Sequence, residues 1–185
     1  MKKIILLVSL IALSFNSLAF SDAGDRRKIQ ETRKKTLTKL YSEQSSTKAK
    51  IKKAAGYATF SNIGVNVIFF SAGGGTGVVH NNKTGKDTYM SMASAGIGIG
   101  MGVKDFSAVF IFHTAESMKK FVDEGWDFSG QADAAAKSGD KGAEASKAGT
   151  IINDVEVYQL TESGIALQAT LQGTKYWKDE DLNSY

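Results

Sequence analysis

Cysteine and proline are both absent from this sequence of 185 residues. Without cysteine the chain can form neither disulfides nor thiolate metal sites, and it lacks the residue that commonly carries a lipid after an export signal. Any attachment to a membrane must therefore be non-covalent. Without proline, every turn must be built from residues such as Gly, Asn, Asp and Ser.

Histidine is also scarce, since only His80 and His113 occur. A chain without cysteine needs a Ser or Thr nucleophile with a histidine base to perform covalent catalysis. His80 lies beside an expected hairpin turn, and His113 ends an apolar segment just before an expected helix. The two histidines do not form the H-x-x-x-H spacing of a metal site. We therefore expect no enzymatic activity, no catalytic residues, no metal site and no cofactor.

A long apolar run occurs once, in the N-terminal stretch "MKKIILLVSLIALSFNSLAFSD". Two lysines precede the run Ile4–Leu13, and Ser17 and Ala19 occupy the −3 and −1 positions of a cleavage site before Phe20, as in a signal peptide. The run is well short of the roughly 20 apolar residues of a membrane-spanning helix. We interpret residues 1–19 as a removed signal peptide, with cleavage after Ser21 as the alternative. The mature protein would be periplasmic or secreted, or bound peripherally to an envelope membrane.

Charge is distributed unevenly along the remaining chain. Eleven Lys and Arg stand against four Asp and Glu from Asp22 to Lys53, whereas the segment from Ala54 to Tyr185 carries ten against fifteen. We therefore divide a single domain into a basic arm, residues 20–53, and a mildly acidic body, residues 54–185. This asymmetry indicates an acidic partner for the arm, such as lipid head groups, nucleic acid or an acidic protein surface. Export disfavours nucleic acid.

The basic arm has a helical pattern. Between Asp25 and Gln44, apolar residues fall on one side of a helix, and Ser45 or Ser46 can cap a second short helix. The stripe is narrow and consists of Ile29, Leu37, Leu40 and Tyr41. Either this stripe docks the arm on the body and leaves a solvated charged face, or the arm forms a surface for a membrane or partner. The candidate lipid-binding residues are Arg26, Arg27, Lys28, Arg33, Lys34, Lys35, Lys39, Lys48, Lys50, Lys52 and Lys53.

After Gly56 the apolar residues alternate with a period of two, which is typical of strands. The strand candidates are "YATF", "VNVIFF", "GVVH", "DTYMSMASAGIGIGMGV", "SAVFIF", "VEVYQL" and "IALQATLQGTKYW", with turns at "HNNKTGKD" and "TESG". This pattern predicts an α+β fold whose antiparallel, glycine-rich sheet is strongly coiled or barrel-like. The segment Gln131–Thr150 is rich in Ala, Gly, Ser and Lys and predicts a long loop or weak helix.

One helix interrupts the expected strands. Thr114 is a suitable N-cap, Glu116 suits the positive first turn, and Gly125 can end the helix. Its buried stripe would consist of Met118, Phe121 and Val122. We expect this helix to pack against the sheet.

The glycine-rich stretch "FFSAGGGTGVVHNNKTGKD" resembles a phosphate-binding loop only superficially. Gly77 is followed by Val78 rather than by the Lys and Ser or Thr of a P-loop, and no G-x-G-x-x-G pattern is present. We therefore assign the stretch to the sheet. Further along, Gly96, Gly98, Gly100 and Gly102 alternate with apolar residues, so that one bare strand face accepts either close backbone packing or a ligand.

Five segments together resemble the SYLF domain in its bacterial exported form, from about Leu37 to Asn183. They are "AAGYATFSNIG", "SAGGGTGVVH", "YMSMASAGIGIGMGVKDFSAVFIFHTAESMKKF", "DFSGQADAAAKSGDKGAEAS" and "VEVYQLTESGIALQATLQG". Ser61 and Asn62 stand where the family pattern has a proline, and the bulky pair expected near "GIALQ" is smaller.

The resemblance implies lipid binding, with phosphoinositides bound by eukaryotic relatives and actin by yeast ones. It also implies that the N-terminal amphipathic helix and its basic residues, here Arg26 to Lys53, touch the membrane. Because neither phosphoinositides nor actin is expected in a bacterial envelope, we expect an anionic phospholipid or membrane surface as the partner. The alternative is a structural or interaction module that binds another protein or an apolar ligand at the glycine-rich face. The oligomeric state is open.

Overall fold

The computed structural model describes residues 2–67, 70–97, 106–127, 150–152, 154–161, 164–165 and 173–184. Its helices are α1 (Lys2–Glu43), α2 (Ser46–Lys53), α3 (Ala115–Glu124) and α5 (Glu180–Asn183). Its strands are β1 (Gly56–Val67), β2 (Phe70–Asn81), β3 (Asp87–Ile97), β4 (Phe106–Phe112), β5 (Trp126–Asp127), β6 (Thr150–Ile152), β7 (Val155–Thr161), β8 (Gly164–Ile165) and β9 (Thr174–Lys178).

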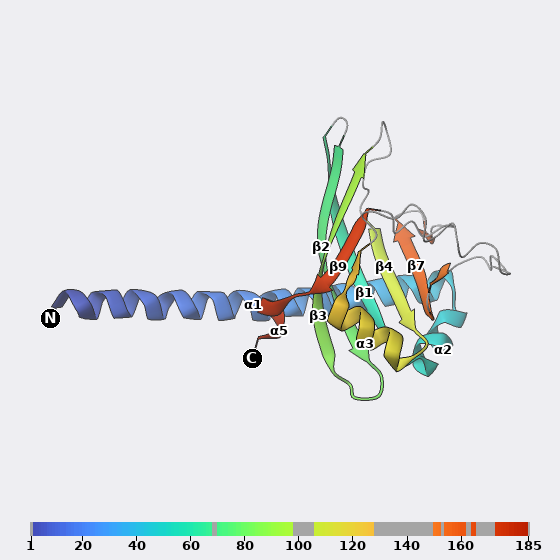
Figure 1. Ribbon diagram of the computed structural model, residues 1–185, viewed down its shortest axis with the longest axis horizontal. Helices are drawn as coiled ribbons and strands as arrows, with labels where there is room; N and C mark the ends of the chain where they lie inside the picture. Colours follow the sequence, from blue (N-terminus) through green and yellow to red (C-terminus); the bar gives the residue numbers. More distant parts are fainter. Residues whose placement is uncertain are drawn as a thin grey trace.

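The strands form one antiparallel sheet in the order β5-β9-β3-β2-β1-β4-β7-β6, with β8 paired to β7. The sheet is strongly curled, and helices cover both of its faces (Figure 1). We call the face that packs against α3 the inner face and the face that packs against α1 and α2 the outer face. The predicted α+β class with a coiled antiparallel sheet is confirmed.

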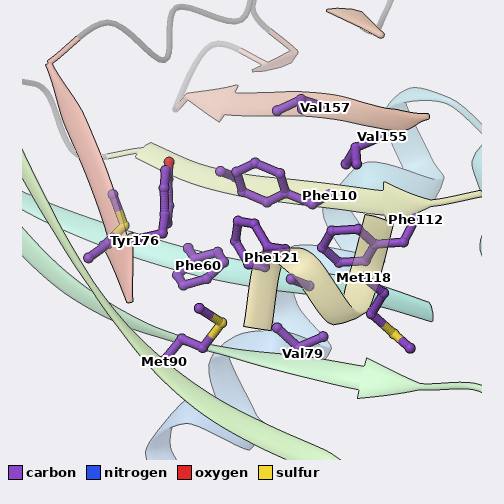
Figure 2. Packing of buried hydrophobic residues seen from close by; sticks show 13 residues of the cluster. Phe60, Val79, Met90, Phe110, Phe112, Met118, Phe121, Val155, Val157 and Tyr176 are labelled. Atoms are coloured by element: carbon purple, nitrogen blue, oxygen red, sulfur yellow. The ribbon is translucent and has the colours of Figure 1, made fainter. Parts of the chain in front are cut away.

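Aromatic residues dominate the core on the inner face. Phe60 from β1, Phe110 from β4 and Tyr176 from β9 converge on Phe121 of α3, and each is at most 1% exposed (Figure 2). Neighbouring rings meet edge to face, for example Phe60 and Tyr176, whose centroids lie 4.8 Å apart. Such pairs contribute about 0.5–1.5 kcal/mol beyond their buried area.

Helix α3 forms as its local signals predict. The side chain of Thr114 accepts a hydrogen bond from the backbone N–H of Ser117 at 3.1 Å, and Gly125 ends the helix with a φ of 70°. Met118 and Phe121 are buried and Val122 packs against them. The predicted cap, stripe and end of this helix are all confirmed.

The glycine-rich stretch lies in the sheet, as predicted, but two predicted strand boundaries were wrong. "YATF" and "VNV" are parts of the single strand β1, and "GVVH" is the end of β2, which starts at Phe70. The two strands stay in register from Gly56↔Asn81 to Val67↔Phe70, so ladder hydrogen bonds continue through the glycines. Gly77 is required by packing, because a Cβ there would lie 2.3 Å from Cδ1 of Phe60.

The cap of α2 and two short strands differ from what the sequence predicts. Ser45 occupies the N-cap position of α2, as one of the two predicted candidates, but its side chain makes no capping hydrogen bond. Ser45 has helical backbone angles there, and the hydroxyl of Thr47 instead donates to the carbonyl of Gln44. The short strands β5 and β6 were not predicted, since two or three residues show no periodicity. Gly98, Gly100, Gly102 and residues 131–149 lie outside the described residues.

Candidate functional site

Helix α1 is docked on the outer face by the predicted apolar stripe. Leu40 is fully buried, and the partly buried Leu37 and Tyr41 pack against the same hydrophobic cluster as Leu40. Ile29 is 6% exposed and lies in a second buried cluster. A buried aliphatic side chain of this size contributes about 1.5–3 kcal/mol to folding. Of the two alternatives for the stripe, docking on the body is therefore confirmed, and these apolar groups do not form an exposed surface in this conformation.

A first polar cluster fixes α1 to the β2–β3 hairpin. Nη1 of Arg33 lies 3.1 Å from both carboxylate oxygens of Asp87, and the amide of Gln30 donates to the same carboxylate at 2.9 Å. Nδ1 of His80 lies 2.6 Å from Oδ1 of Asp87. Arg33 and His80 are thus partners of Asp87, in a cluster that is about three-quarters buried.

A second polar cluster fixes α2 to β7. Nζ of Lys50 lies 2.6 Å from Oε1 of Glu156, whose side chain is only 6% exposed, and the hydroxyl of Tyr158 donates to the same oxygen at 2.5 Å. Burial raises the pKa of the Tyr158 phenol, and the hydrogen bond and the charge of Glu156 raise it further. Nε2 of His113 lies 3.6 Å from the other carboxylate oxygen. Lys50 therefore balances a buried negative charge.

Three further candidate cations also make contacts within the protein. Arg26 donates to the carbonyl of Leu182 at 3.2 Å, and Lys39 donates to the carbonyl of Thr161 at 2.6 Å. Lys28, which is 76% exposed, lies 3.3 Å from the carboxylate of Asp25. Arg26 and Lys39 connect α1 to the C-terminal part of the chain, whereas Lys28 forms a pair within its own helix.

The remaining six candidate residues point outward. All six are exposed, and within the described part of the chain their side chains have neither a hydrogen-bond partner nor an ion-pair partner. They are Arg27, Lys34 and Lys35 on α1, and Lys48, Lys52 and Lys53 on α2. We call this set the outward cations. The structure thus divides the eleven predicted residues into a set engaged in internal contacts and a set available to a partner.

Two more lysines lie next to α2, and the sequence analysis did not include them. The side-chain amide of Asn82, in the β2–β3 turn, donates to the carbonyls of Ile51 and Ala54 at 2.7 and 2.9 Å. This contact places the turn, with the exposed residues Lys83 and Lys86, at the C-terminal end of α2. The signal for these residues was the turn "HNNKTGKD", but its contact with α2 depends on the tertiary fold.

The opposite end of the outer face is acidic. A cleft of about 460 Å³ lies between α1, α5 and the sheet, and Thr59, Ser61 and Thr76 form part of its wall. Its lining includes four aspartates, which are Asp22, Asp25, Asp179 and Asp181. Because α5 and α2 lie at different ends of the docked part of α1 (Figure 1), the outward cations of α2 are separated from this acidic cleft.

Within the described ranges, no three side chains of His, Cys, Asp or Glu are grouped so that they could hold a metal ion. The same part of the chain contains no helix with the length and apolar character needed to cross a membrane.

Comparison with known proteins places the chain in a family. The family described as "Ysc84: Las17-binding protein actin regulator" matches residues 93–185. The chain belongs to this family, whose characteristic unit is the SYLF domain.

A curated relative is "Beta cell expansion factor A" of Aeromonas veronii, which is 35% identical over 147 residues. The alignment covers 79% of this chain and 54% of the relative, so the chain spans about half the length of that protein.

Proposed function

We propose that this protein binds the surface of membranes that contain anionic phospholipid, through the outward cations of α1 and α2. The observation that carries the proposal is the exposure of six cationic side chains with no internal partner among the described residues. Each Lys or Arg near an anionic bilayer contributes about 1 kcal/mol of attraction. The other five candidate residues would act indirectly, because they hold the two helices on the body or pair locally.

The proposed role is binding rather than catalysis. The lipid partner is what the resemblance to the SYLF domain implies, and the N-terminal sequence supports export to the periplasm or the exterior. The protein would then lie peripherally on an envelope membrane, with charge rather than an inserted helix as its main attachment. Attachment of this kind is reversible and weakens as salt screens the charges.

Sedimentation with vesicles tests the proposal. The full chain should bind vesicles of phosphatidylglycerol and phosphatidylcholine, and bind vesicles of phosphatidylcholine alone much more weakly. Changing Lys34→Glu and Lys35→Glu together should weaken binding by on the order of tenfold or more. The control changes Lys175→Glu and Lys178→Glu on β9, which are also exposed and alter the net charge equally, but which pair with Asp127 and Glu180 and are not outward cations.

The control variant should bind at least nearly as well as the parent. Circular dichroism should show that both variants keep the parent's fold. Equal losses in the two variants would mean that net charge, rather than the outward cations, controls binding. A parent protein that does not sediment with anionic vesicles at low salt would contradict the proposal.

A further inference from the structure

A second cleft lies on the inner side of the sheet, between α3 and the β2–β3 hairpin. Its volume is about 320 Å³. The buried Val79 and Met118, the half-buried Val122 and the exposed Ala115 form the apolar part of its wall, and Asn81 and Thr88 add polar groups to the lining. Figure 2 shows Val79 and Met118 near each other at the edge of the aromatic core. Met118 lies directly over Gly56, where an added Cβ would lie 2.4 Å from its sulfur.

Charged side chains surround this apolar wall. Lys86, Lys119 and Asp123 line the same cleft and are all exposed. Lys119 forms an ion pair with Asp123 on the next turn of α3, so these two charges largely compensate each other. Lys86 has no such partner in the described chain and supplies the uncompensated positive charge.

We propose that this cleft takes one acyl chain of an anionic phospholipid, whose head group lies against Lys86. The proposal rests on the proposed function, since it assumes that the protein meets anionic lipid, but it concerns a different surface. An apolar wall beside an uncompensated cation complements a molecule with an apolar tail and a negatively charged head. Lys83, in the same turn, adds a second exposed cation near the head group.

The size of the cleft decides between an acyl chain and larger occupants. Ligand pockets have volumes of about 300–1,000 Å³, so this cleft lies at the small end of the range. One unbranched chain is the narrowest apolar occupant, and at least a part of it can enter a small cleft that is open at a charged end.

The position of the cleft relative to α2 connects it with the outward cations. Asn82 bonds the β2–β3 turn to the carbonyl groups at the end of α2, so Lys83 and Lys86 lie at the same end of the molecule as Lys52 and Lys53. A lipid whose head group is held at this turn would therefore be part of the same anionic surface that α2 meets.

Photochemical labelling in vesicles tests this site in the full chain. The probe is a phosphatidylglycerol that carries a diazirine near the end of one acyl chain, diluted into phosphatidylglycerol and phosphatidylcholine. We expect adducts on peptides that contain residues 79–88 and 115–122. Lys86→Glu should reduce this labelling at least roughly fivefold, because it removes one cation that contributes about 1 kcal/mol near an anionic surface and adds a negative charge.

A second variant fills the cleft without altering the core. Ala115→Trp places a large ring at an exposed position of the cleft wall, and it should abolish most of the labelling of residues 79–88 while vesicle binding persists. Lys120→Trp is the matched control. Lys120 is exposed on the same helix and does not line the cleft, so this variant should be labelled like the parent.

The outcomes separate this inference from the proposed function. If the parent sediments with anionic vesicles but adducts fall only outside residues 79–88 and 115–122, the cleft proposal is overturned and surface binding stands. Equal loss of labelling in Ala115→Trp and Lys120→Trp also overturns it. A water-soluble short-chain phosphatidylglycerol provides an independent measurement. If this soluble lipid slows the hydrogen exchange of residues 115–122 in a protein that does not sediment with vesicles, the result would support the cleft and contradict the proposed function.

Discussion

Nζ of Lys50 lies 2.6 Å from Oε1 of Glu156, although the two residues are 106 positions apart in the sequence. The carboxylate is on the outer face of β7 and almost fully buried, so its charge is stabilised by Lys50 and by the hydroxyl of Tyr158. Leaving such a group without a partner costs more than the pair itself contributes, because desolvation is then uncompensated. Lys50 is therefore a structural residue within the basic arm.

Lys50→Met should lower the free energy of unfolding by about 1–3 kcal/mol, since one hydrogen-bonded charge partner of a buried carboxylate is lost. The change keeps the apolar stem of the side chain, which isolates the role of the ammonium. Lys53→Met on the same helix is the matched control, because Lys53 is exposed and should change stability by less than about 0.5 kcal/mol. Urea unfolding of the three proteins checks this, and equal stability of both variants would contradict it.

Two buried phenols predict a loss of stability at alkaline pH. Burial raises the pKa of Tyr158, as does its contact with Glu156, and burial also raises the pKa of Tyr176. Unfolding returns both groups to the ordinary tyrosine value of 10.0. Their contribution to stability is therefore complete below that pH and is lost progressively as the pH rises above it.

We expect the free energy of unfolding to fall as the pH rises above about 10, with a smaller slope in Tyr158→Phe than in the parent. The comparison of slopes matters because the variant also loses the hydrogen bond to Glu156, which shifts stability at every pH. Thermal melts followed by circular dichroism give the slope, and tyrosinate absorbance reports ionisation. A folded protein in which all six tyrosines ionise together near pH 10 would contradict the assignment.

Local elements of this fold follow from the sequence, whereas contacts between distant segments do not. The cap at Thr114, the end at Gly125 and the turn before Asp87 depend on a few adjacent residues, and all were predicted. Arg33 meets Asp87 and Asn82 meets α2 only because β1, β2 and β3 pair in a particular order. Local periodicity does not encode that order.

The eleven candidate cations show the same limit. Their spacing indicated a basic helical surface, but its orientation depends on how Ile29 and Leu40 dock. Once these two residues face the sheet, Lys34 and Lys35 must face outward. Each lysine is five or six positions from Ile29 and from Leu40, which places it about 120–140° away from them on a helix of about 100° per residue. Helical geometry alone could therefore have identified some of the outward cations. The structural role of Lys50 could not be predicted without knowing where Glu156 lies in the fold.

Two glycines of β2, Gly77 and Gly74, should respond oppositely to a methyl group. At Gly77 a Cβ would lie 2.3 Å from Cδ1 of Phe60 and 2.4 Å from the carbonyl oxygen of Thr59, so Gly77→Ala should cost about 1–3 kcal/mol. Gly74→Ala is the control, because the nearest atom to its Cβ would be the carbonyl oxygen of Met92 at 4.0 Å. Gly74→Ala should be neutral or slightly stabilising, since alanine reduces the entropy of the unfolded chain. Chemical unfolding of both variants decides, and a Gly77→Ala variant as stable as the parent would show that Phe60 can move aside.

Salt dependence distinguishes attraction of the outward cations from insertion of the apolar stripe of α1. Leu40 is fully buried in the docked helix, so insertion would require α1 to leave the sheet and lose about 1.5–3 kcal/mol for each such side chain. We therefore expect binding to phosphatidylglycerol vesicles to fade as salt approaches 1 M, where the screening length is about 3 Å.

Leu40→Ser should destabilise the fold by about 2–5 kcal/mol, yet the molecules that remain folded should bind like the parent. Sedimentation at low and high salt, at a temperature where circular dichroism shows the variant folded, makes this comparison. Binding to neutral vesicles that persists at high salt and disappears only in Leu40→Ser would show instead that α1 undocks and inserts its stripe.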